Sequence, residues 1–278
     1  MPISPCVFSD EVADTFADSV RIAAENGCPG LEIRGRLHGG RSVTQIDDDD
    51  VRAMQAILRQ HGAHVAVIGS PVGKCDGDRP GERAQHQRRF QRMTELAHAF
   101  GTRVIRGFAL WRPDRSRDTD HLRPNLDEHM DSIVSFLEPI VAHAGAHDVL
   151  LGLETEGATM VGTCAEARRV MDALGNPACL GVTWDVNNGQ RHGEPAYPDG
   201  FELLRDRVFH VHVKPNSVKS LATIGDSDLT YADLLRLLRD NGYAGAASIE
   251  HWGSQEHTLS GIRQLVPLLR EINGDAAS

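Results

Sequence analysis

Short apolar runs alternate with longer segments of helical periodicity along the whole chain. Runs rich in β-branched side chains and flanked by Gly, Pro or Asn are typical of buried strands. They lie at 5–9, 30–34, 64–69, 102–108, 149–154, 179–185, 208–213 and 246–250. Amphipathic periodicity predicts helices near 14–26, 47–60, 82–100, 126–144, 164–174, 199–206, 230–241 and 257–272. Strands and helices in strict alternation favour a closed parallel sheet with helices outside it.

Turn signals support this organisation. Glycine follows many of the predicted helices, where a left-handed residue commonly ends a helix; these are Gly27, Gly62, Gly101, Gly145, Gly175 and Gly242. No Pro/Ser-rich linker or low-complexity run divides the chain. We therefore expect an α/β fold, a (β/α)8 TIM barrel, with a single domain over residues 1–278. The longest irregular stretch, 109–125, falls in the fourth strand-to-helix loop, and loops of that length are often functional.

Polar residues share one face of several predicted strands. On the sixth strand Thr183 and Asp185 oppose Trp184, and on the seventh His210 and His212 oppose the apolar positions. Ionisable groups inside a barrel cost several kcal/mol unless they are paired or bound to metal. Because active sites of such barrels lie at the carboxyl ends of the strands, these residues predict a site at that end.

Four polar residues at or near the ends of the fifth to eighth strands stand out: Glu154, Asp185, His212 and Glu250. Three carboxylates and one imidazole suit a hard or borderline divalent ion better than a thiolate-preferring one. The sequence therefore predicts a single divalent metal ion, with Mn²⁺ favoured and Mg²⁺, Co²⁺ or Zn²⁺ as alternatives. The acidic run from Asp47 to Asp50 is interpreted differently, as the capped start of a helix.

Composition limits the classes of molecule that the protein is expected to bind. With 39 acidic and 29 basic residues the formal net charge is −10, which argues against a nucleic-acid backbone as partner. The five cysteines are scattered and form no CxxC motif, so we expect reduced thiols and a cytoplasmic protein. No segment approaches the roughly 18 consecutive apolar residues that span a bilayer. A small polar molecule is the expected partner.

Eight segments, taken in order, follow a recognisable pattern: PheSerAspGluValAla at 8–13, GlyLeuGluIleArgGly at 30–35, GlySerProValGlyLys at 69–74, LeuAlaHisAlaPheGlyThrArgValIleArg at 96–106, LeuGluThrGlu at 153–156, TrpAspValAsnAsn at 184–188, HisValHisValLys at 210–214 and SerIleGluHis at 248–251. In this order they resemble the sugar phosphate isomerase/epimerase family of the xylose-isomerase-like TIM barrels. The resemblance spans nearly the whole chain.

The resemblance implies that Glu154, Asp185, His212 and Glu250 bind one divalent ion. It also implies that Glu154 and Glu250 are catalytic and move a proton of a sugar or sugar phosphate through a cis-enediolate, as in an isomerase or epimerase. The alternative is a dehydratase or lyase that acts on a keto-sugar or keto-inositol by β-elimination. An endonuclease for abasic sites is disfavoured by the acidic charge. A carbohydrate substrate and a homo-oligomer are further expectations.

Two departures from the family pattern concern the substrate. Asn188 stands where related epimerases often have a histidine, and Pro215 stands where many members have aspartate. Five residues are candidate substrate-binding groups, each with a structural alternative: Asn188, Lys214, Glu32, Arg106 and His210. Asn188 could instead be a turn residue and Lys214 a partner for a carboxylate. Glu32 could form a structural ion pair with Arg34, and Arg106 could likewise belong to a structural ion pair. His210 could pack in the interior or support a metal ligand.

Overall fold

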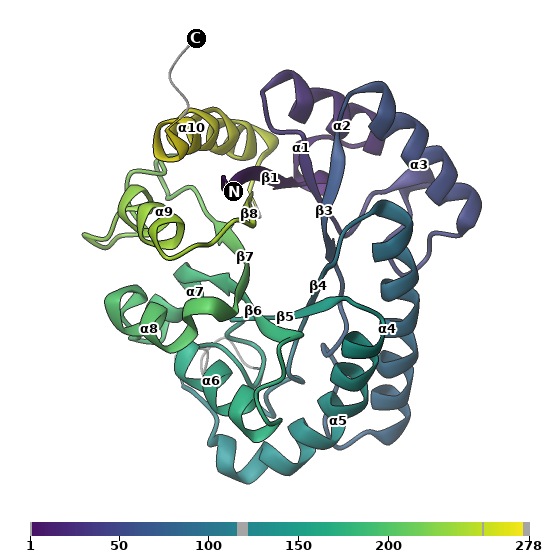
Figure 1. Cartoon of the computed structure of the whole chain (residues 1–278), viewed down its shortest axis with the longest axis vertical. Coiled ribbons are helices and arrows are strands. Elements are labelled where there is room, and N and C mark those ends of the chain that lie inside the picture. The colour runs from purple at the N-terminus through teal and green to yellow at the C-terminus, as the bar shows by residue number, and fades with distance from the viewer. Residues whose placement is uncertain (1, 116–121, 252, 275–278) are drawn as a thin grey trace. The chain divides into compact units, whose positions relative to one another are not determined.

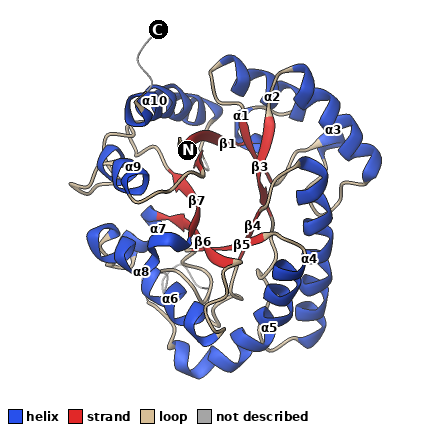
Figure 2. Ribbon diagram, viewed as in Figure 1, coloured by secondary structure: helices blue, strands red, loops and turns tan. Residues whose placement is uncertain are grey.

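The structure is a computed structural model that describes residues 2–115, 122–251 and 253–274. Eight strands follow one another in sequence order around a closed parallel barrel, and Figure 2 shows the strands and helices in separate colours. The strands are β1 (Ser4–Phe8), β2 (Gly30–Ile33), β3 (His64–Gly69), β4 (Val104–Gly107), β5 (Leu150–Glu154), β6 (Leu180–Asp185), β7 (Val208–Val213) and β8 (Ala246–Ile249). The predicted (β/α)8 fold class is therefore confirmed.

The chain divides into two compact units. The first comprises Met1–Gly69, Ala99–Thr102 and His210–Ser278, and the second comprises Ser70–His98 and Arg103–Phe209. Each unit is described by itself below. That residues 1–278 form a single domain stays a prediction.

In the first unit β1 pairs in parallel with β2 and β8, β2 pairs with β3, and β7 pairs with β8. Its helices are α1 (Ser9–Val12), α2 (Phe16–Glu25), α3 (Asp48–Gln60), α9 (Tyr231–Asp240) and α10 (Gln255–Asn273), with a short helical turn η1 (His38–Gly40). Figure 1 shows α2 between α1 and α3, and α10 packs against β1 and β8.

In the second unit β5 pairs in parallel with both β4 and β6. Its helices are α4 (Pro80–Phe100), α5 (Leu126–Ala146), α6 (Cys164–Ala173), α7 (Val186–Arg191) and α8 (Phe201–Leu204), with short turns η3 (Ala196–Gly200) and η4 (Arg205–Arg207). Trp184 of β6 stacks on Phe201 of α8. Since successive side chains of a strand point to opposite faces, Thr183 and Asp185 lie on the other face of β6, as the alternation predicts.

Side-chain caps begin several helices where the sequence places them. Asp47 accepts hydrogen bonds from the amides of Asp49 and Asp50 and forms a capping box at the start of α3. This confirms the interpretation of the acidic run as a helix start. The side chains of Thr15, Thr163 and Thr230 each accept a hydrogen bond from one backbone amide at the start of α2, α6 and α9, and Thr163 also forms a capping box.

The glycine signals are confirmed with one exception. Gly27, Gly62, Gly101, Gly175 and Gly242 all adopt positive φ angles just past a helix. Gly145 does not, because α5 continues to Ala146 and the positive φ falls on Asp148. The prediction of a stop at Gly145 was therefore wrong, because glycine in helical geometry costs only about 1 kcal/mol relative to alanine and tertiary packing can carry the helix through it.

Other differences concern short helices. The helix predicted over 199–206 is reduced to α8, with η3 and η4 on either side. The sequence analysis did not predict α1 or α7, which have 4 and 6 residues. Segments of this length are too short to show an apolar face of period 3.6. All five cysteines are free thiols, and among the described residues no helix is long and apolar enough to cross a membrane.

Candidate metal and catalytic site

Glu154 ends β5 beside an arginine of the neighbouring strand. The Nη1 atom of Arg106 on β4 lies 3.1 Å from Oε2 of Glu154, and both side chains are buried. The register explains the contact, because Arg106 is paired with Gly152, two residues before Glu154 on the same face of β5. Arg106 is therefore the ion-pair partner of a predicted catalytic residue, which is the structural alternative raised for it.

Asp185 ends β6 and caps the helix that follows. Its Oδ1 atom accepts a hydrogen bond from the amide of Asn188, 3.2 Å away, so that it begins α7. Thr155 holds the backbone of Asp185 from both sides: the Thr155 hydroxyl accepts from the Asp185 amide at 2.9 Å and is 3.0 Å from the Asp185 carbonyl, to which it donates. These contacts fix where the carboxylate of Asp185 points.

Asn188 lies in α7 and not in the turn that was its structural alternative. Its side-chain amide donates a hydrogen bond to the carbonyl of Thr155 at 2.8 Å, and the residue is buried. This bond satisfies a buried carbonyl and links α7 to the end of β5. A substrate contact by Asn188 stays a prediction.

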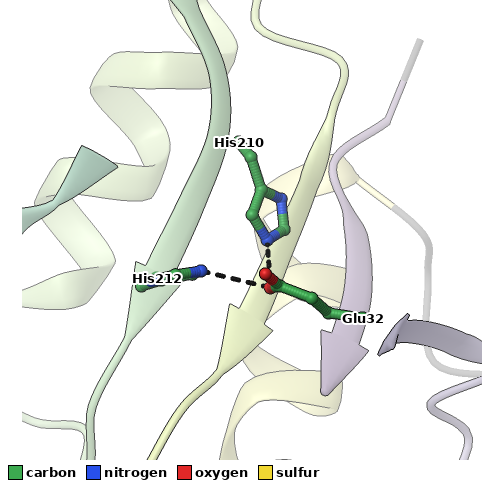
Figure 3. A group of neighbouring side chains, drawn as sticks. All are labelled: Glu32, His210 and His212. Atoms are coloured by element: carbon green, nitrogen blue, oxygen red, sulfur yellow. Dashed lines mark hydrogen bonds and ion pairs between the residues drawn. The ribbon is translucent and has the colours of Figure 1, made fainter. Parts of the chain in front are cut away.

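His212 of β7 lies in a buried cluster with Glu32 of β2 and His210 of β7. Figure 3 shows both imidazole rings directed at the carboxylate of Glu32. The Nε2 atoms of His210 and His212 lie 3.0 Å and 3.1 Å from Oε2 of Glu32. The side chains of all three residues are fully buried. Glu32 and His210 thus contact a predicted metal ligand.

The cluster is electrostatically coupled. Burial alone would raise the pKa of the Glu32 carboxyl, but His212 and His210 outweigh it and bring this pKa well below its usual value. Burial alone would lower the pKa of the His212 imidazole, but Glu32 and Glu250 outweigh it and hold this pKa well above its usual value. The cluster therefore retains ionised groups in a buried place because they compensate one another.

Glu250 follows β8 and meets three cationic or imidazole groups. Its Oε2 atom lies 3.3 Å from Nδ1 of His212 and 3.2 Å from Nζ of Lys214. Its Oε1 atom lies 3.4 Å from Nη1 of Arg34. The amide of Glu250 donates to the carbonyl of Val213 at 3.1 Å, which ties the residue to the end of β7. Lys214 is thus paired with a carboxylate, as its structural alternative states.

Two acidic residues of α1, Asp10 and Glu11, contact Arg34, which also contacts Glu250. The sequence analysis did not identify them as site residues. Arg34 Nε lies 3.0 Å from Asp10, and Arg34 Nη2 lies 3.1 Å from Glu11. Burial, followed by the negative charge of Glu250, raises the pKa of the Glu11 carboxyl to about 8, although Arg34 opposes this change. Their position directly after the carboxyl end of β1 was the signal that could have identified them.

The predicted ligands have side chains that suit a metal site. Glu154 and Asp185 of the second unit and His212 and Glu250 of the first are all buried. Within the first unit, Glu32, His210 and His212 also form a group that could hold a metal ion, because each offers a potential ligand atom within 4.8 Å of the others. Three carboxylates with one imidazole form an oxygen-rich set that fits Mn²⁺, Mg²⁺ or Co²⁺. The donor chemistry is thus compatible with a divalent ion.

Comparison with known proteins gives the family and the fold. A family model described as "Xylose isomerase-like TIM barrel" matches residues 20–272. No curated protein matches the chain in sequence. A probable 3-DHS dehydratase from Bacillus anthracis, involved in petrobactin synthesis, has a TM-score of 0.71 at 19% identity, over 96% of this chain and 99% of that chain.

Two further solved structures are similar. A 3-keto-D-glucoside 4-epimerase from E. coli has a TM-score of 0.70 at 20% identity, over 98% of this chain and 99% of that chain. A xylose isomerase-like TIM barrel protein from Mycobacterium smegmatis, in complex with magnesium, has a TM-score of 0.73 at 14% identity, over 98% of this chain and 97% of that chain. At these identities the likeness shows the fold alone.

Proposed function

Because this chain belongs to the xylose isomerase-like TIM barrel family, we propose that it is a metal-dependent isomerase or epimerase of a sugar or sugar phosphate. The observation that supports the proposal is that Glu154, Asp185, His212 and Glu250 are buried ligand-type side chains at or beside the carboxyl ends of β5, β6, β7 and β8. Mn²⁺ is the favoured ion, because carboxylate oxygens and one imidazole suit it well. When bound, the ion would supply positive charge beside the substrate oxygen on which negative charge develops.

The two glutamates would carry the proton. Glu154 is held by Arg106 and Glu250 by Lys214 and Arg34, so each carboxylate has a defined orientation. One glutamate would take the proton from the carbon next to the substrate carbonyl, and the other would return a proton. Return to the opposite face of the same carbon gives epimerisation, and return to the neighbouring carbon gives isomerisation.

Among the five candidate substrate-binding residues, we assign direct contact to Lys214. Its side chain is 20% exposed, whereas Glu32, His210, Arg106 and Asn188 are at most 7% exposed. An ammonium beside Glu250 can donate a hydrogen bond to a substrate hydroxyl or phosphate while it keeps the carboxylate in place. We infer that the other four residues act mainly by supporting the ligands and the strand ends.

A second candidate is a dehydratase or lyase that acts on a keto-sugar or keto-inositol. The observation that favours it is again the ammonium of Lys214, 3.2 Å from Glu250. After a glutamate has removed the proton, this ammonium could protonate a departing β-hydroxyl, so that water leaves and a double bond forms. The similar structure described as a probable 3-DHS dehydratase agrees in fold with this alternative.

The experiment that tests both candidates is solvent exchange in D₂O, followed by NMR. Mn²⁺-loaded enzyme would be incubated with ketoses, ketose phosphates and keto-inositols, and the recovered sugars examined in diamagnetic buffer after the ion is removed. The test variant is Glu250→Gln. Glu166→Gln is a matched control, because Glu166 is also buried and paired, with Arg123, but caps α6.

Metal-dependent deuterium incorporation into a recovered or isomerised sugar, lost in Glu250→Gln and kept in Glu166→Gln, supports the isomerase or epimerase. Loss of water from the substrate without return of its skeleton selects the lyase. Incorporation that persists in Glu250→Gln at the wild-type rate contradicts the assignment of the two glutamates.

We infer from the negative charge that the partner is not nucleic acid, and from the family that it is a small carbohydrate. A homo-oligomeric state and a cytoplasmic location remain predictions. Light scattering of the purified protein tests the first, and fractionation of the cells that produce it tests the second.

A further inference from the structure

Glu32 and His210 take no part in the proton transfer proposed above, yet both lie fully buried against His212 (Figure 3). We propose that Glu32, held in place by His210, fixes the tautomer and orientation of His212 so that Nδ1 is the ring nitrogen that would bind the metal ion. Glu32 and His210 are then positioning residues. This inference rests on the proposed metal site, but not on the reaction carried out there.

The two ring nitrogens of His212 have different neighbours. Nε2 lies 3.1 Å from Oε2 of Glu32, and Nδ1 lies 3.3 Å from Oε2 of Glu250. An ionised carboxylate can accept hydrogen bonds but cannot donate them. The contact with Glu32 therefore requires a proton on Nε2 of His212. With Nε2 as the donor to Glu32, Nδ1 is the ring nitrogen that can offer a lone pair, and it lies on the side of Glu250. The ring is thereby oriented with Nδ1, its potential metal-binding nitrogen, toward Glu250.

The ring of His212 is also restrained from the side. Phe8 of β1 meets it edge to face, with the ring centroids 5.2 Å apart. The packing limits rotation of the imidazole, but it cannot select a tautomer, because a benzyl side chain offers no acceptor. The carboxylate of Glu32 supplies the selection, as the second hydrogen bond of a metal-bound histidine generally does.

His210 explains how Glu32 keeps its orientation. His210 and His212 are two residues apart on β7, so their side chains share one face of the strand. Both Nε2 atoms contact the same oxygen of Glu32, at 3.0 Å and 3.1 Å. Two donors that converge on one oxygen define its position more narrowly than one donor would. Removal of His210 should therefore loosen Glu32 and, through it, His212.

A second ion among Glu32, His210 and His212 is the competing explanation, since these residues offer ligand atoms that lie close together. The distances of 3.0 Å and 3.1 Å are those of hydrogen bonds from ring N–H groups to a carboxylate. A nitrogen that donates a proton to Glu32 cannot bind an ion at the same time. We therefore favour positioning, and the number of bound ions decides between the two.

The test is the affinity of the full-length protein for Mn²⁺, measured by calorimetry after removal of bound metal. Glu32→Gln keeps the shape of the side chain but loses its charge, so we expect Mn²⁺ binding to weaken roughly 10- to 100-fold. The matched control is Glu166→Gln, which makes the same substitution at another buried, paired carboxylate. This control should bind Mn²⁺ as wild type does. Equal affinity in Glu32→Gln and wild type would overturn the proposal.

Two substitutions of His210 keep the test decisive if Glu32→Gln fails to fold. His210→Gln retains an N–H donor toward Glu32 and should keep the Mn²⁺ affinity within a few-fold of wild type. His210→Leu removes the donor and should weaken binding more. Circular dichroism identifies the variants that fold. If both folded variants bind like wild type, His210 does not position the ligand.

A spectroscopic readout separates positioning from general loosening. In protein with ¹⁵N-labelled histidine and diamagnetic Mg²⁺, the ring shifts of His212 should report a proton on Nε2 and none on Nδ1. In Glu32→Gln this single tautomer should give way to a mixture. Two ions per wild-type chain and one per Glu32→Gln chain would instead establish the second metal site. Absence of any sugar exchange activity would overturn the proposed reaction while leaving these results intact.

Discussion

The guanidinium of Arg106 lies 3.1 Å from a carboxylate oxygen of Glu154, and both side chains are almost fully buried. Removing one partner of a buried ion pair leaves an uncompensated charge, at a cost of about 3–5 kcal/mol. We expect Arg106→Met to lower the free energy of unfolding of the metal-free protein by this amount. Urea denaturation at neutral pH measures it.

The double variant Arg106→Met with Glu154→Gln provides the control for this prediction. Because it removes both charges together, it should be more stable than Arg106→Met alone by at least about 1 kcal/mol. Simple addition of the two single losses would show that the pair is not energetically coupled.

Replacement of Asn188 should mainly reduce the stability of the folded protein. The side-chain amide of Asn188 satisfies the buried carbonyl of Thr155, and leaving a buried acceptor without its hydrogen bond costs about 1–3 kcal/mol. We expect Asn188→Ala to be destabilised by this amount in thermal or urea unfolding, with little change in KM for the substrate identified by exchange. A variant of wild-type stability with a raised KM would instead establish the substrate contact that the sequence suggests.

Glu11 should make stability depend on pH. Its pKa rises from an ordinary value of 4.5 to about 8 in the folded protein. Between these values the folded protein holds a proton that the unfolded chain has released, so the contribution of Glu11 to the free energy of unfolding falls as the pH rises. A tenfold change in proton affinity corresponds to about 1.4 kcal/mol, so a rise in pKa from 4.5 to about 8 corresponds to a fall of roughly 5 kcal/mol in total.

Glu11→Gln cannot ionise and should lose this contribution. Relative to wild type it should gain stability from pH 5 to pH 8, which urea denaturation in the presence of a chelator can measure. The comparison cancels the titration of groups that the two proteins share. Parallel stability curves for wild type and variant would show that Glu11 is ionised in the folded protein throughout this range.

Metal binding should stabilise the folded protein. An ion that binds only the folded state at about one hundred times its Kd adds about 2.7 kcal/mol to the free energy of unfolding. We expect the melting temperature to rise with Mn²⁺ and to return to its starting value with a chelator. Asp185→Asn should show a smaller rise, because it removes one charge from the donor set. An identical rise in wild type and variant would exclude Asp185 as a ligand.

The acidic start of α3 provides a test outside the site. Asp47 accepts from the amides of Asp49 and Asp50, and loss of an N-cap side chain costs about 1 kcal/mol. We expect Asp47→Ala to lose this much stability and to bind the same number of ions as wild type. Asp48→Ala makes the same substitution in the first helical turn, outside the cap position, and should change stability less. Loss of a bound ion in Asp47→Ala would contradict the helix-cap interpretation.

Most strands and helices could be predicted because their signals are local. The bounds of β3 and β7 match the predicted ranges, and α3 begins beside the capping residue Asp47. The potential ligands were proposed from alternation along each strand and from their place near its carboxyl end, and metal binding by them stays a prediction. The short helices α1 and α7 were not predicted, because one or two helical turns are too short to show a repeating pattern of apolar residues.

Interactions between distant segments could not be predicted. Glu32 and His212 are 180 positions apart, and nothing near either residue in the sequence indicates the other. The sequence analysis gave a pair between Glu32 and its neighbour Arg34 as one alternative, whereas the structure shows that Arg34 contacts Asp10, Glu11 and Glu250. Strand curvature and side-chain length decide such contacts, and neither can be derived from local periodicity.

The sequence by itself determined the alternation of strands and helices, the barrel class and the residues that could bind a divalent ion, because each depends on periodicity and residue chemistry within a short segment. Only the tertiary structure decided which ring nitrogen of His212 contacts Glu32 and which cation holds each glutamate. The physical reason is that hydrogen bonds and ion pairs require atoms to lie within about 3–4 Å of one another. That proximity arises when the strands associate and the side chains pack.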